Sequence, residues 1–334
     1  MKHENSKLIT ARVVAQYRGK YRVLYNNDEF WAEVTGKIMY TAKSPLDYPL
    51  VGDLVNIISL SDENCLIKDI HARKSILARK AINNTEIQPI AANVDTAFIV
   101  QAVDRDFNLN RFERYLTIVQ AGKIKPILVL NKIDLVSSQE LEDKLLSIKN
   151  RFKNVEILTT STIKQNGDEA LEHVIKKGQI YCLLGSSGVG KSSLINKLLG
   201  QELIKTRTIS TSTNKGKHVT THRELFVLKG GGMVIDNPGI REVGVADAGK
   251  AVAEIFGDIS MLAKNCKFSD CTHNHELGCA VLAAIESGQL SKKQYLNYQK
   301  LKKETDYYAL SSLEKKQKDR SFGRMVKSFK KQMK

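Results

Sequence analysis

The stretch from Gly185 to Ser193 has the residue types and spacing of a phosphate-binding loop. It contains the pattern G-x-x-x-x-G-K-S directly after the apolar run 180–184, so a strand leads into a helix. Glycines let successive backbone N–H groups point at phosphate oxygens at the helix start, and Lys191 is the predicted catalytic cation. A chance glycine-rich turn is the alternative. The predicted nucleotide-binding residues are Gly185, Ser186, Ser187, Gly188, Val189, Gly190, Lys191, Ser192 and Ser193.

A second motif, Asn131-Lys132-Ile133-Asp134, follows the apolar run 126–130 and so sits at the carboxyl end of a predicted buried strand. The carboxylate of Asp134 can accept hydrogen bonds from N1–H and the exocyclic amine of guanine, a pairing that adenine cannot make. Asn131 and Lys132 are expected to shape the pocket. Thr160 and Ser161, after another apolar run, are expected to contact the base. These residues predict binding of GTP rather than ATP.

A third group of residues could hold Mg²⁺ beside the phosphates. The run 233–235 reads as a strand that ends in Asp236, which would hold the ion, and the amide of Gly239 would sense the γ-phosphate. The segment 206–221 is rich in Ser, Thr, Lys and Gly, as is typical of a switch loop. Ser192 and Thr221 are the predicted hydroxyl ligands, with Thr220 as an alternative to Thr221. For each threonine, a solvated loop hydroxyl is the other interpretation.

The residue after Gly239 bears on the mechanism, because Ile240 stands where Ras-like enzymes place a glutamine that orients the attacking water. Isoleucine cannot orient water. Either hydrolysis is slow until a partner completes the site, or another residue replaces the glutamine. His218 is the candidate catalytic residue for that role, and an exposed loop histidine is the alternative.

Three of the five cysteines cluster with histidines near the C-terminus: Cys266, Cys271, His273 and Cys279, with His275 as a competing nitrogen. Such spacing favours one structural Zn²⁺ in a Cys₃His site, since four protein ligands leave no open position for catalysis. Reduced structural thiols are the alternative. Cys65 and Cys182 fall in apolar strand patterns and are expected in the core.

The elements around these motifs indicate several domains in 334 residues. Five short runs with strand character in residues 1–75 fit a small β-barrel of the OB type, whose face often binds single-stranded nucleic acid. Aromatic residues on these strands could stack on bases or pack the core, and Tyr17, Tyr21, Tyr25 and Trp31 are the candidates. Residues 73–80 read as a basic linker or a solvated connector.

Charge points to a polyanionic partner. The chain has 52 basic and 36 acidic residues, a formal net charge of +16, and residues 314–334 hold nine basic against two acidic residues, net +7. RNA is the expected partner of this tail, and an interfacial membrane helix is the rival. No apolar run approaches the roughly 18 residues that a membrane span needs, and the polar start is no signal peptide, so we expect a cytoplasmic protein.

The order of the motifs, with Asn131–Asp134 before the phosphate loop, is that of a circularly permuted GTPase. Together with 216–225, Asn93-Val94-Asp95, 106–116 and the cysteine cluster, it resembles the ribosome small-subunit-dependent GTPase A family of bacteria. The chain departs from that family's pattern at Asn237, where Thr or Ser is usual, which affects only a local hydrogen bond. The family pattern favours His273 over His275 as the zinc ligand.

The resemblance implies an α/β fold: a circularly permuted P-loop GTPase domain between an N-terminal OB-fold barrel and a C-terminal zinc-bound helical domain. The expected domains are 1–75, 76–245, 246–312 and a basic tail, 313–334. It also implies hydrolysis of GTP to GDP on the 30S ribosomal subunit, with 16S rRNA as a partner, by a monomer that checks subunit maturation. A GTP-dependent RNA-binding scaffold with negligible turnover, or a GTPase acting on another RNA, are the alternatives.

Overall fold

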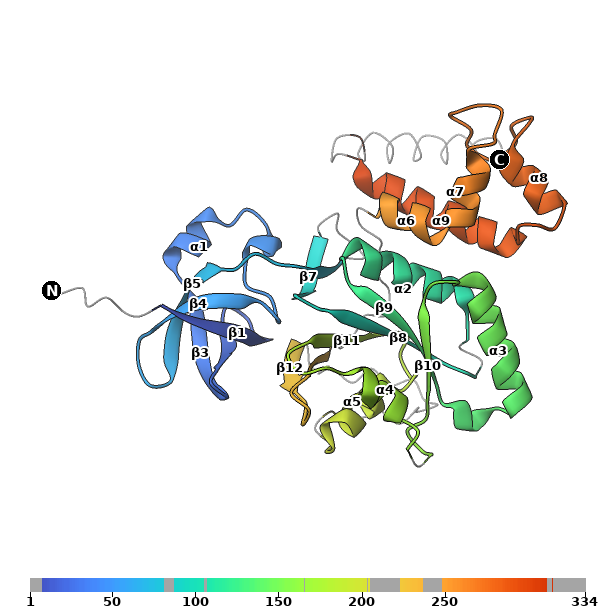
Figure 1. Cartoon of the computed structure of the whole chain (residues 1–334). Coiled ribbons are helices and arrows are strands. Elements are labelled where there is room, and N and C mark those ends of the chain that lie inside the picture. The colour runs from blue at the N-terminus through green and yellow to red at the C-terminus, as the bar shows by residue number, and fades with distance from the viewer. Residues whose placement is uncertain are drawn as a thin grey trace, which may run out of the picture. The chain divides into compact units, whose positions relative to one another are not determined.

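In the computed structural model, five strands near the N-terminus close into a barrel (Figure 1). They follow the order β1-β2-β3-β5-β4, and β4 pairs again with β1, which closes the ring. The β3–β5 pair is parallel and the other pairs are antiparallel. This is a barrel of the OB type, as predicted. The strands are β1 (Ile9–Gln16), β2 (Tyr21–Tyr25), β3 (Asp28–Val34), β4 (Leu54–Ser59) and β5 (Asn64–Ile70), with α1 (Gly36–Thr41) and η1 (Pro45–Asp47) between β3 and β4.

Side chains alternate between the inside and the outside of the barrel along each strand, which divides its aromatic residues into two groups. Tyr21 points inward and is only 4% exposed, so of the two interpretations core packing is confirmed for this residue. Tyr25 also packs against the barrel core. Trp31 points outward and is 37% exposed, with its ring 5.4 Å from that of Tyr17 and 4.9 Å from the Arg22 guanidinium. Two of the four candidates therefore pack inside the barrel wall.

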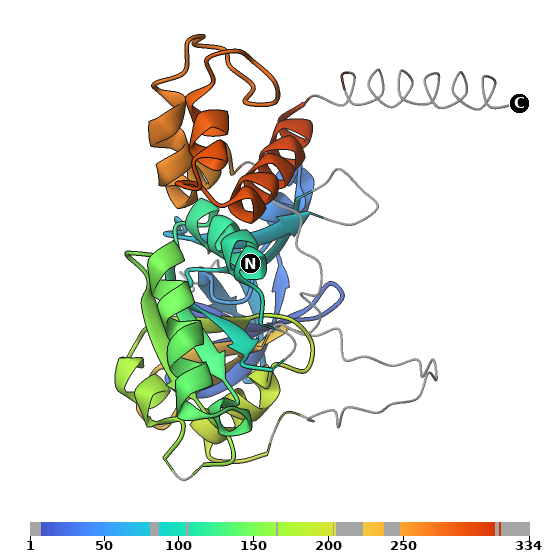
Figure 2. The ribbon, with the colours of Figure 1, turned by 90° about the vertical axis from the view of Figure 1, so that its right-hand side faces the viewer.

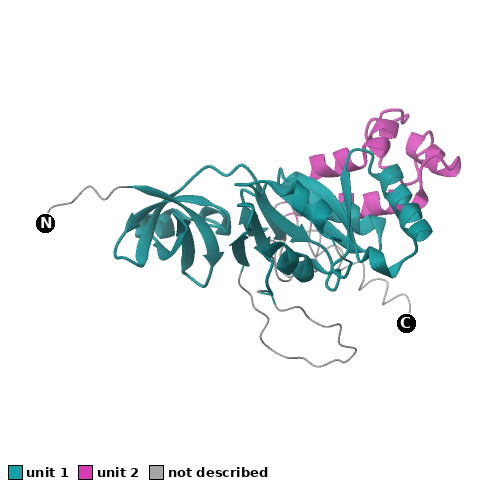
Figure 3. Ribbon diagram, turned by 60° about the horizontal axis from the view of Figure 1, so that its bottom comes forward, with its two compact units in different colours: residues 1–243 teal, residues 244–334 magenta. Residues whose placement is uncertain are grey.

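The structure describes residues 8–80, 87–104, 107–164, 166–202, 204, 223–236, 248–310 and 314. The chain forms two units, 1–243 and 244–334 (Figure 3). The first unit holds the barrel and the α/β sheet, and the second holds the cysteine cluster. The finer boundaries expected from the sequence stay predictions.

The α/β part is built on a six-stranded sheet of order β10-β9-β8-β11-β13-β12, in which only β12 runs antiparallel. Parallel strands buried on both faces need continuous apolar runs, and the runs expected at 126–130 and 180–184 form two inner strands of this sheet. The strands are β8 (Thr96–Ala102), β9 (Lys125–Asn131), β10 (Glu156–Thr160), β11 (Ile180–Leu184), β12 (Arg223–Val227) and β13 (Met233–Asp236).

Helices cover both faces of this sheet. Leu171 of α4 (Glu169–Val174) and Leu194 of α5 (Lys191–Leu199) pack with Phe98 and Tyr181 in one buried cluster, so these helices share a face. The opposite face is covered by α2 (Leu109–Ala121), and Figure 2 shows α3 (Ser138–Arg151) beside the sheet. Cys182 lies in the centre, where burial raises the pKa of its thiol to about 12. Cys182 and Cys65 are both buried, as expected.

The barrel and the α/β sheet are joined by backbone pairing. Strand β1 of the barrel pairs antiparallel with β12, so one sheet of eleven strands runs through the first unit. The connection between them includes the hairpin of β6 (Ile76–Lys80) and β7 (Ile87–Ala92). Arg73 is not a solvated linker residue, because its guanidinium is buried against Asp53 at 2.7 Å. Ser75 and Leu77 are buried as well, so the solvated-connector interpretation is wrong for these three residues, whereas the side chain of Lys74 is exposed.

The second unit is helical within its described residues. It contains α6 (Gly249–Ile255), α7 (Gly257–Ala263), α8 (Ala280–Glu286) and α9 (Lys292–Ala309), and Phe256, Ile259, Val281 and Leu301 are buried in it. The cysteine cluster lies in the loop between α7 and α8. Among the described helices of the chain, none is long and apolar enough to cross a membrane.

Candidate nucleotide site and metal centre

The phosphate loop connects β11 to α5 and uses its glycines where other residues would not fit. Gly185, Gly188 and Gly190 have φ values of +148°, +85° and +98°, which side chains strongly disfavour. A Cβ on Gly185 would lie 2.2 Å from the carbonyl oxygen of Val100, and one on Gly190 would lie 2.3 Å from the amide nitrogen of Asn131. The backbone must therefore pass this closely, and the loop is packed against β8 and β9.

Lys191 is the first residue of α5, and its side chain folds back over the loop. Its ammonium donates hydrogen bonds to the carbonyl oxygens of Gly185 (2.8 Å) and Ser186 (2.7 Å). The helix begins at this lysine, so the N-terminal dipole of α5 and the lysine charge act at the same place. The site has the arrangement that stabilises bound phosphate.

Asn131, at the end of β9, joins the two nucleotide motifs. Its side chain is fully buried, and its amide donates to the carbonyl oxygen of Val189 in the phosphate loop at 2.8 Å. Its own carbonyl oxygen accepts from the Thr160 hydroxyl, 2.9 Å away at the end of β10. Three strand ends that are far apart in sequence thus meet at one side chain. The structure therefore brings the guanine motif and the phosphate loop together.

The residues predicted to contact the base form a second polar group next to Asn131. The Ser161 hydroxyl donates to a carboxylate oxygen of Asp134 at 2.5 Å, and it accepts from the N–H groups of residues 163 and 164. Lys132 has a left-handed backbone (φ 63°), and its ammonium lies 3.8 Å from the Asp104 carboxylate. The carboxylate of Asp134 is thereby held in one orientation at the sheet edge.

The predicted magnesium ligands are only partly within the described residues. Strands β11 and β13 pair in parallel, so Asp236 leaves the sheet at the same edge as the phosphate loop that precedes Ser192. The other predicted residues on this side, His218, Thr221 and Gly239, lie outside the described residues, as do Asn237, Ile240 and the basic tail after residue 314. Their roles stay predictions.

Several residues at the site were not predicted from the sequence. The Arg111 guanidinium lies 3.4 Å from the Ser186 hydroxyl, and the buried Tyr115 hydroxyl also hydrogen-bonds that serine. Gly167 passes so close to Ser161 that a Cβ there would lie 2.3 Å from the serine carbonyl oxygen. The contacts of Ser186 with Arg111 and Tyr115 join residues about 70 positions apart in sequence, so no local pattern signals them.

The cysteine cluster brings its four predicted ligands together. One ligand atom from each of Cys266, Cys271, His273 and Cys279 lies within 4.8 Å of all the others. The Cys266 and Cys279 sulfurs are 3.9 Å apart, and each lies 3.5 Å from Nδ1 of His273. Tetrahedral Zn²⁺ with its usual bond lengths would separate two sulfurs by about 3.8 Å and a sulfur and a nitrogen by about 3.6 Å. The donor set and spacing therefore fit a tetrahedral metal ion.

The surroundings of the cluster favour metal binding. Burial lowers the pKa of His273, and the nearby Lys302 lowers it further, which keeps the imidazole in the neutral form that binds metals. The backbone carbonyl of His273 accepts from the Tyr295 hydroxyl, and Gln299 donates to that hydroxyl in turn. The backbone of His273 is thus anchored from α9. The cluster can hold a metal ion.

A sheet of this strand order, with the phosphate loop after the guanine motif in the chain, defines a circularly permuted GTPase. A family model described as "RsgA GTPase" matches residues 70–246. Over 322 residues the chain is 42% identical to the small ribosomal subunit biogenesis GTPase RsgA 2 of Lactiplantibacillus plantarum, covering 96% of this chain and 90% of that protein. It is 39% identical to RsgA 1 of Bacteroides thetaiotaomicron, with the same coverage. The chain therefore belongs to the RsgA GTPase family, and it is a GTPase.

A solved structure agrees with this fold. The crystal structure of YloQ, described as a circularly permuted GTPase, superposes with a TM-score of 0.63 at 24% identity, covering 93% of this chain and 99% of YloQ.

Proposed function

We propose that this chain acts in the biogenesis of the small (30S) ribosomal subunit, where it hydrolyses GTP to GDP and phosphate and assists or checks late maturation. The relatives that share its full length are named for that process. The observation that carries the nucleotide part of the proposal is Asn131, whose single buried side chain joins the guanine motif to the phosphate loop.

In the proposed reaction, the phosphate loop and Lys191 stabilise negative charge on the transferring phosphoryl group. Lys191 would exchange its carbonyl partners in the loop for phosphate oxygens. Mg²⁺ would be held by Ser192, Thr221 and Asp236 and would neutralise phosphate charge. The carboxylate of Asp134, oriented by Ser161, would select guanine.

The water-positioning role is proposed for His218. Because Ile240 cannot orient water, we expect slow hydrolysis by the free protein and acceleration by the 30S subunit. The His218→Ala variant should then lose most of the stimulated rate while its GTP affinity stays nearly unchanged, since the interaction forms mainly in the transition state.

RNA binding is proposed for the barrel and the basic tail. The exposed ring of Trp31, with Tyr17 beside it and the Arg22 guanidinium over it, offers a surface on which a base of 16S rRNA can stack. The net charge of +16 supports an RNA partner. We propose a cytoplasmic monomer that needs no membrane.

The metal in the cysteine cluster is proposed to be one structural Zn²⁺ per chain. Three thiolates and one imidazole match the preferences of zinc and leave no position for a substrate. The ion would link the loop between α7 and α8 into the second unit, which has a small apolar core.

The decisive experiment measures multiple-turnover GTP hydrolysis with no ribosomes, with 30S subunits and with 50S subunits as the control. Stimulation by 30S subunits alone, with co-sedimentation that requires a non-hydrolysable GTP analogue, would support the proposal. A chain that binds 30S subunits but never turns over would instead be a GTP-dependent scaffold. A chain stimulated by another RNA alone would be a GTPase with a different partner.

A further inference from the structure

Strand β12 connects the barrel to the phosphate side of the nucleotide site. On one side, its residues Arg223 and Glu224 pair with Gln16 and Ala15 of β1. On the other side, Glu224 pairs with Asp236 of β13. A single row across the sheet therefore runs from the barrel through β12 to the predicted magnesium residue. A shift of β1 must move β12, because their backbones share the same ladder.

The first residue of β12 is a partly buried arginine. The Arg223 guanidinium donates to the carbonyl oxygen of Pro89 in the β6–β7 hairpin at 2.8 Å. Burial lowers the pKa of Arg223, as does the positive charge of Arg79, yet arginine remains charged at neutral pH. Within the described part of the chain, the partner of this cation is a carbonyl oxygen and not a carboxylate, which is an expensive way to stabilise a fold. This cost suggests that the arginine has a role other than stability.

Arg223 also lines a cleft of about 340 Å³ that collects residues from three elements. The barrel contributes Gln16 from β1 and Leu50, the hairpin contributes Pro89, and β12 contributes Arg223. A change in the angle between barrel and sheet would reshape this cleft and displace the guanidinium from the Pro89 carbonyl. Movement of the barrel would therefore displace the Arg223 side chain directly.

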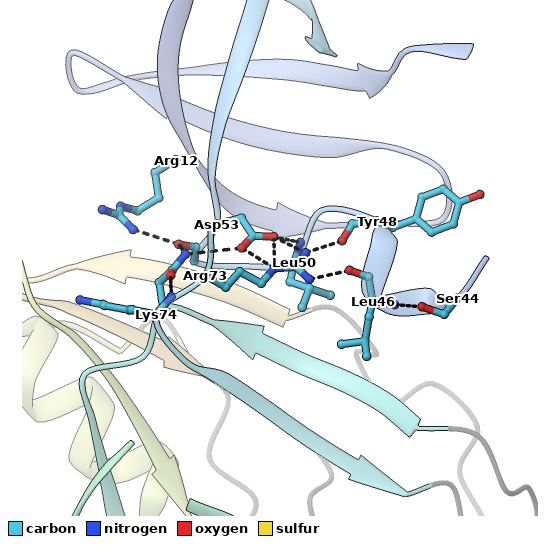
Figure 4. Close-up of polar contacts among 10 residues, drawn as sticks. Arg12, Ser44, Leu46, Tyr48, Leu50, Asp53, Arg73 and Lys74 are labelled. Atoms are coloured by element: carbon cyan, nitrogen blue, oxygen red, sulfur yellow. Dashed lines mark hydrogen bonds and ion pairs between the residues drawn. The ribbon is translucent and has the colours of Figure 1, made fainter. Parts of the chain in front are cut away.

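The junction beside this cleft is firmly tied. Figure 4 shows the Arg73 guanidinium between the buried Asp53 carboxylate and the carbonyl oxygens of Leu46 and Tyr48. Asn93 of the α/β part donates to the carbonyl oxygen of Gly52, 3.2 Å away. These contacts restrain the root of the barrel. A displacement of the barrel would then move β12 through its pairing with β1, because the contacts of Arg73 and Asn93 keep the connecting segment from moving independently.

We propose that Arg223 is a positioning residue for GTP hydrolysis: by holding the start of β12 against the barrel and the β6–β7 hairpin, it sets the position of Asp236 relative to the phosphate loop. The inference rests on the proposed use of Asp236 with Mg²⁺. It makes the barrel a regulator of the γ-phosphate side of the site, in addition to its proposed binding of RNA.

The test compares Arg223→Gln, Arg223→Lys and a matched control, Arg79→Ala. Arg79 lies on the β6–β7 hairpin that Arg223 contacts and carries the same charge, and its side chain donates to Gln88 at the surface. For each full-length variant, kcat and KM for GTP are measured with 30S subunits. The affinities for GDP and for a non-hydrolysable GTP analogue are measured with and without Mg²⁺. The thermal midpoint checks folding.

We expect Arg223→Gln to lower kcat about tenfold and to weaken Mg²⁺-dependent analogue binding about tenfold, with GDP affinity without Mg²⁺ nearly unchanged. Arg223→Lys should recover part of both effects, because an ammonium can still donate to the Pro89 carbonyl. Arg79→Ala should match the wild type.

Equal losses of GDP and analogue binding that follow a lower thermal midpoint would show a merely structural role and overturn the inference. Unchanged kcat and unchanged Mg²⁺ dependence in Arg223→Gln would overturn it as well. If the wild type shows no turnover with 30S subunits while Arg223→Gln still loses Mg²⁺-dependent binding, the proposed function fails, and the part of the inference that stands is that Arg223 positions Asp236 for nucleotide binding.

Discussion

Replacement of Asn131 by alanine should damage the nucleotide site more than any single base contact. The change removes a donor to the Val189 carbonyl at 2.8 Å and an acceptor for the Thr160 hydroxyl at 2.9 Å, both in a fully buried setting. Each buried polar group left without a partner costs about 1–3 kcal/mol, so the total is about 2–6 kcal/mol. Part of this cost lowers the free energy of unfolding, and part lowers GTP affinity because Val189 belongs to the phosphate loop.

We expect Asn131→Ala to bind GTP about tenfold to a hundredfold more weakly, which corresponds to about 1.4–2.8 kcal/mol. Calorimetric titration with GTP and urea unfolding would measure the two parts separately. A milder variant, Thr160→Val, serves as the control, because it removes one of the two hydrogen bonds and should show about half of the total loss. GTP affinity within about twofold of the wild type in Asn131→Ala would refute the reasoning.

Three further predictions concern other parts of the site. Asp134→Asn should weaken GTP binding and favour xanthosine triphosphate, because the C2 carbonyl of xanthine needs a hydrogen-bond donor. Competition binding with both nucleotides would measure this change of preference, and unchanged GTP affinity would contradict the guanine assignment. Lys191→Ala should abolish hydrolysis and leave the circular dichroism spectrum intact, because the ammonium acts on phosphate rather than on packing, whereas normal turnover would place the active site elsewhere. Protein purified without added metal should carry one Zn²⁺ per chain by elemental analysis. The Cys266→Ser variant should lose both the Zn²⁺ and the fold of the second unit. A folded wild type with less than about a tenth of an equivalent of Zn²⁺ would rule the zinc site out.

Local patterns were sufficient to predict the barrel strands, four strands of the α/β sheet, the phosphate loop and the cysteine cluster, whereas β6, β7, β8 and β12 were not predicted. The loop at Gly185 follows an apolar run whose length and flanks define a buried strand, and the four metal ligands lie within 14 residues of sequence. The order of the two nucleotide motifs fixed the permuted topology, because each motif belongs at the end of a particular strand.

Contacts between distant residues could not be predicted in this way. The arginine at 73 looks like one more solvated basic residue in sequence, and only the fold places it against Asp53. Tyr21 and Trp31 lie on neighbouring strands with similar aromatic character, and the strand register decides that one faces the core and the other the solvent. The β1–β12 pairing has no sequence signature at all, since it depends on how two domains meet.

The pairing of β1 with β12 has a consequence for synthesis of the chain. The barrel can fold as soon as its first 70 residues leave the ribosome, but the strand that covers Ala15 and Gln16 is made much later. With about 200 residues between the two strands and elongation at about 5–20 residues per second, that edge of β1 waits about 10–40 seconds for its partner. An uncovered strand edge is a template for pairing with other chains. We therefore expect the nascent chain to be most prone to aggregation in this interval, and a translational pause before residue 223 to lower the soluble yield.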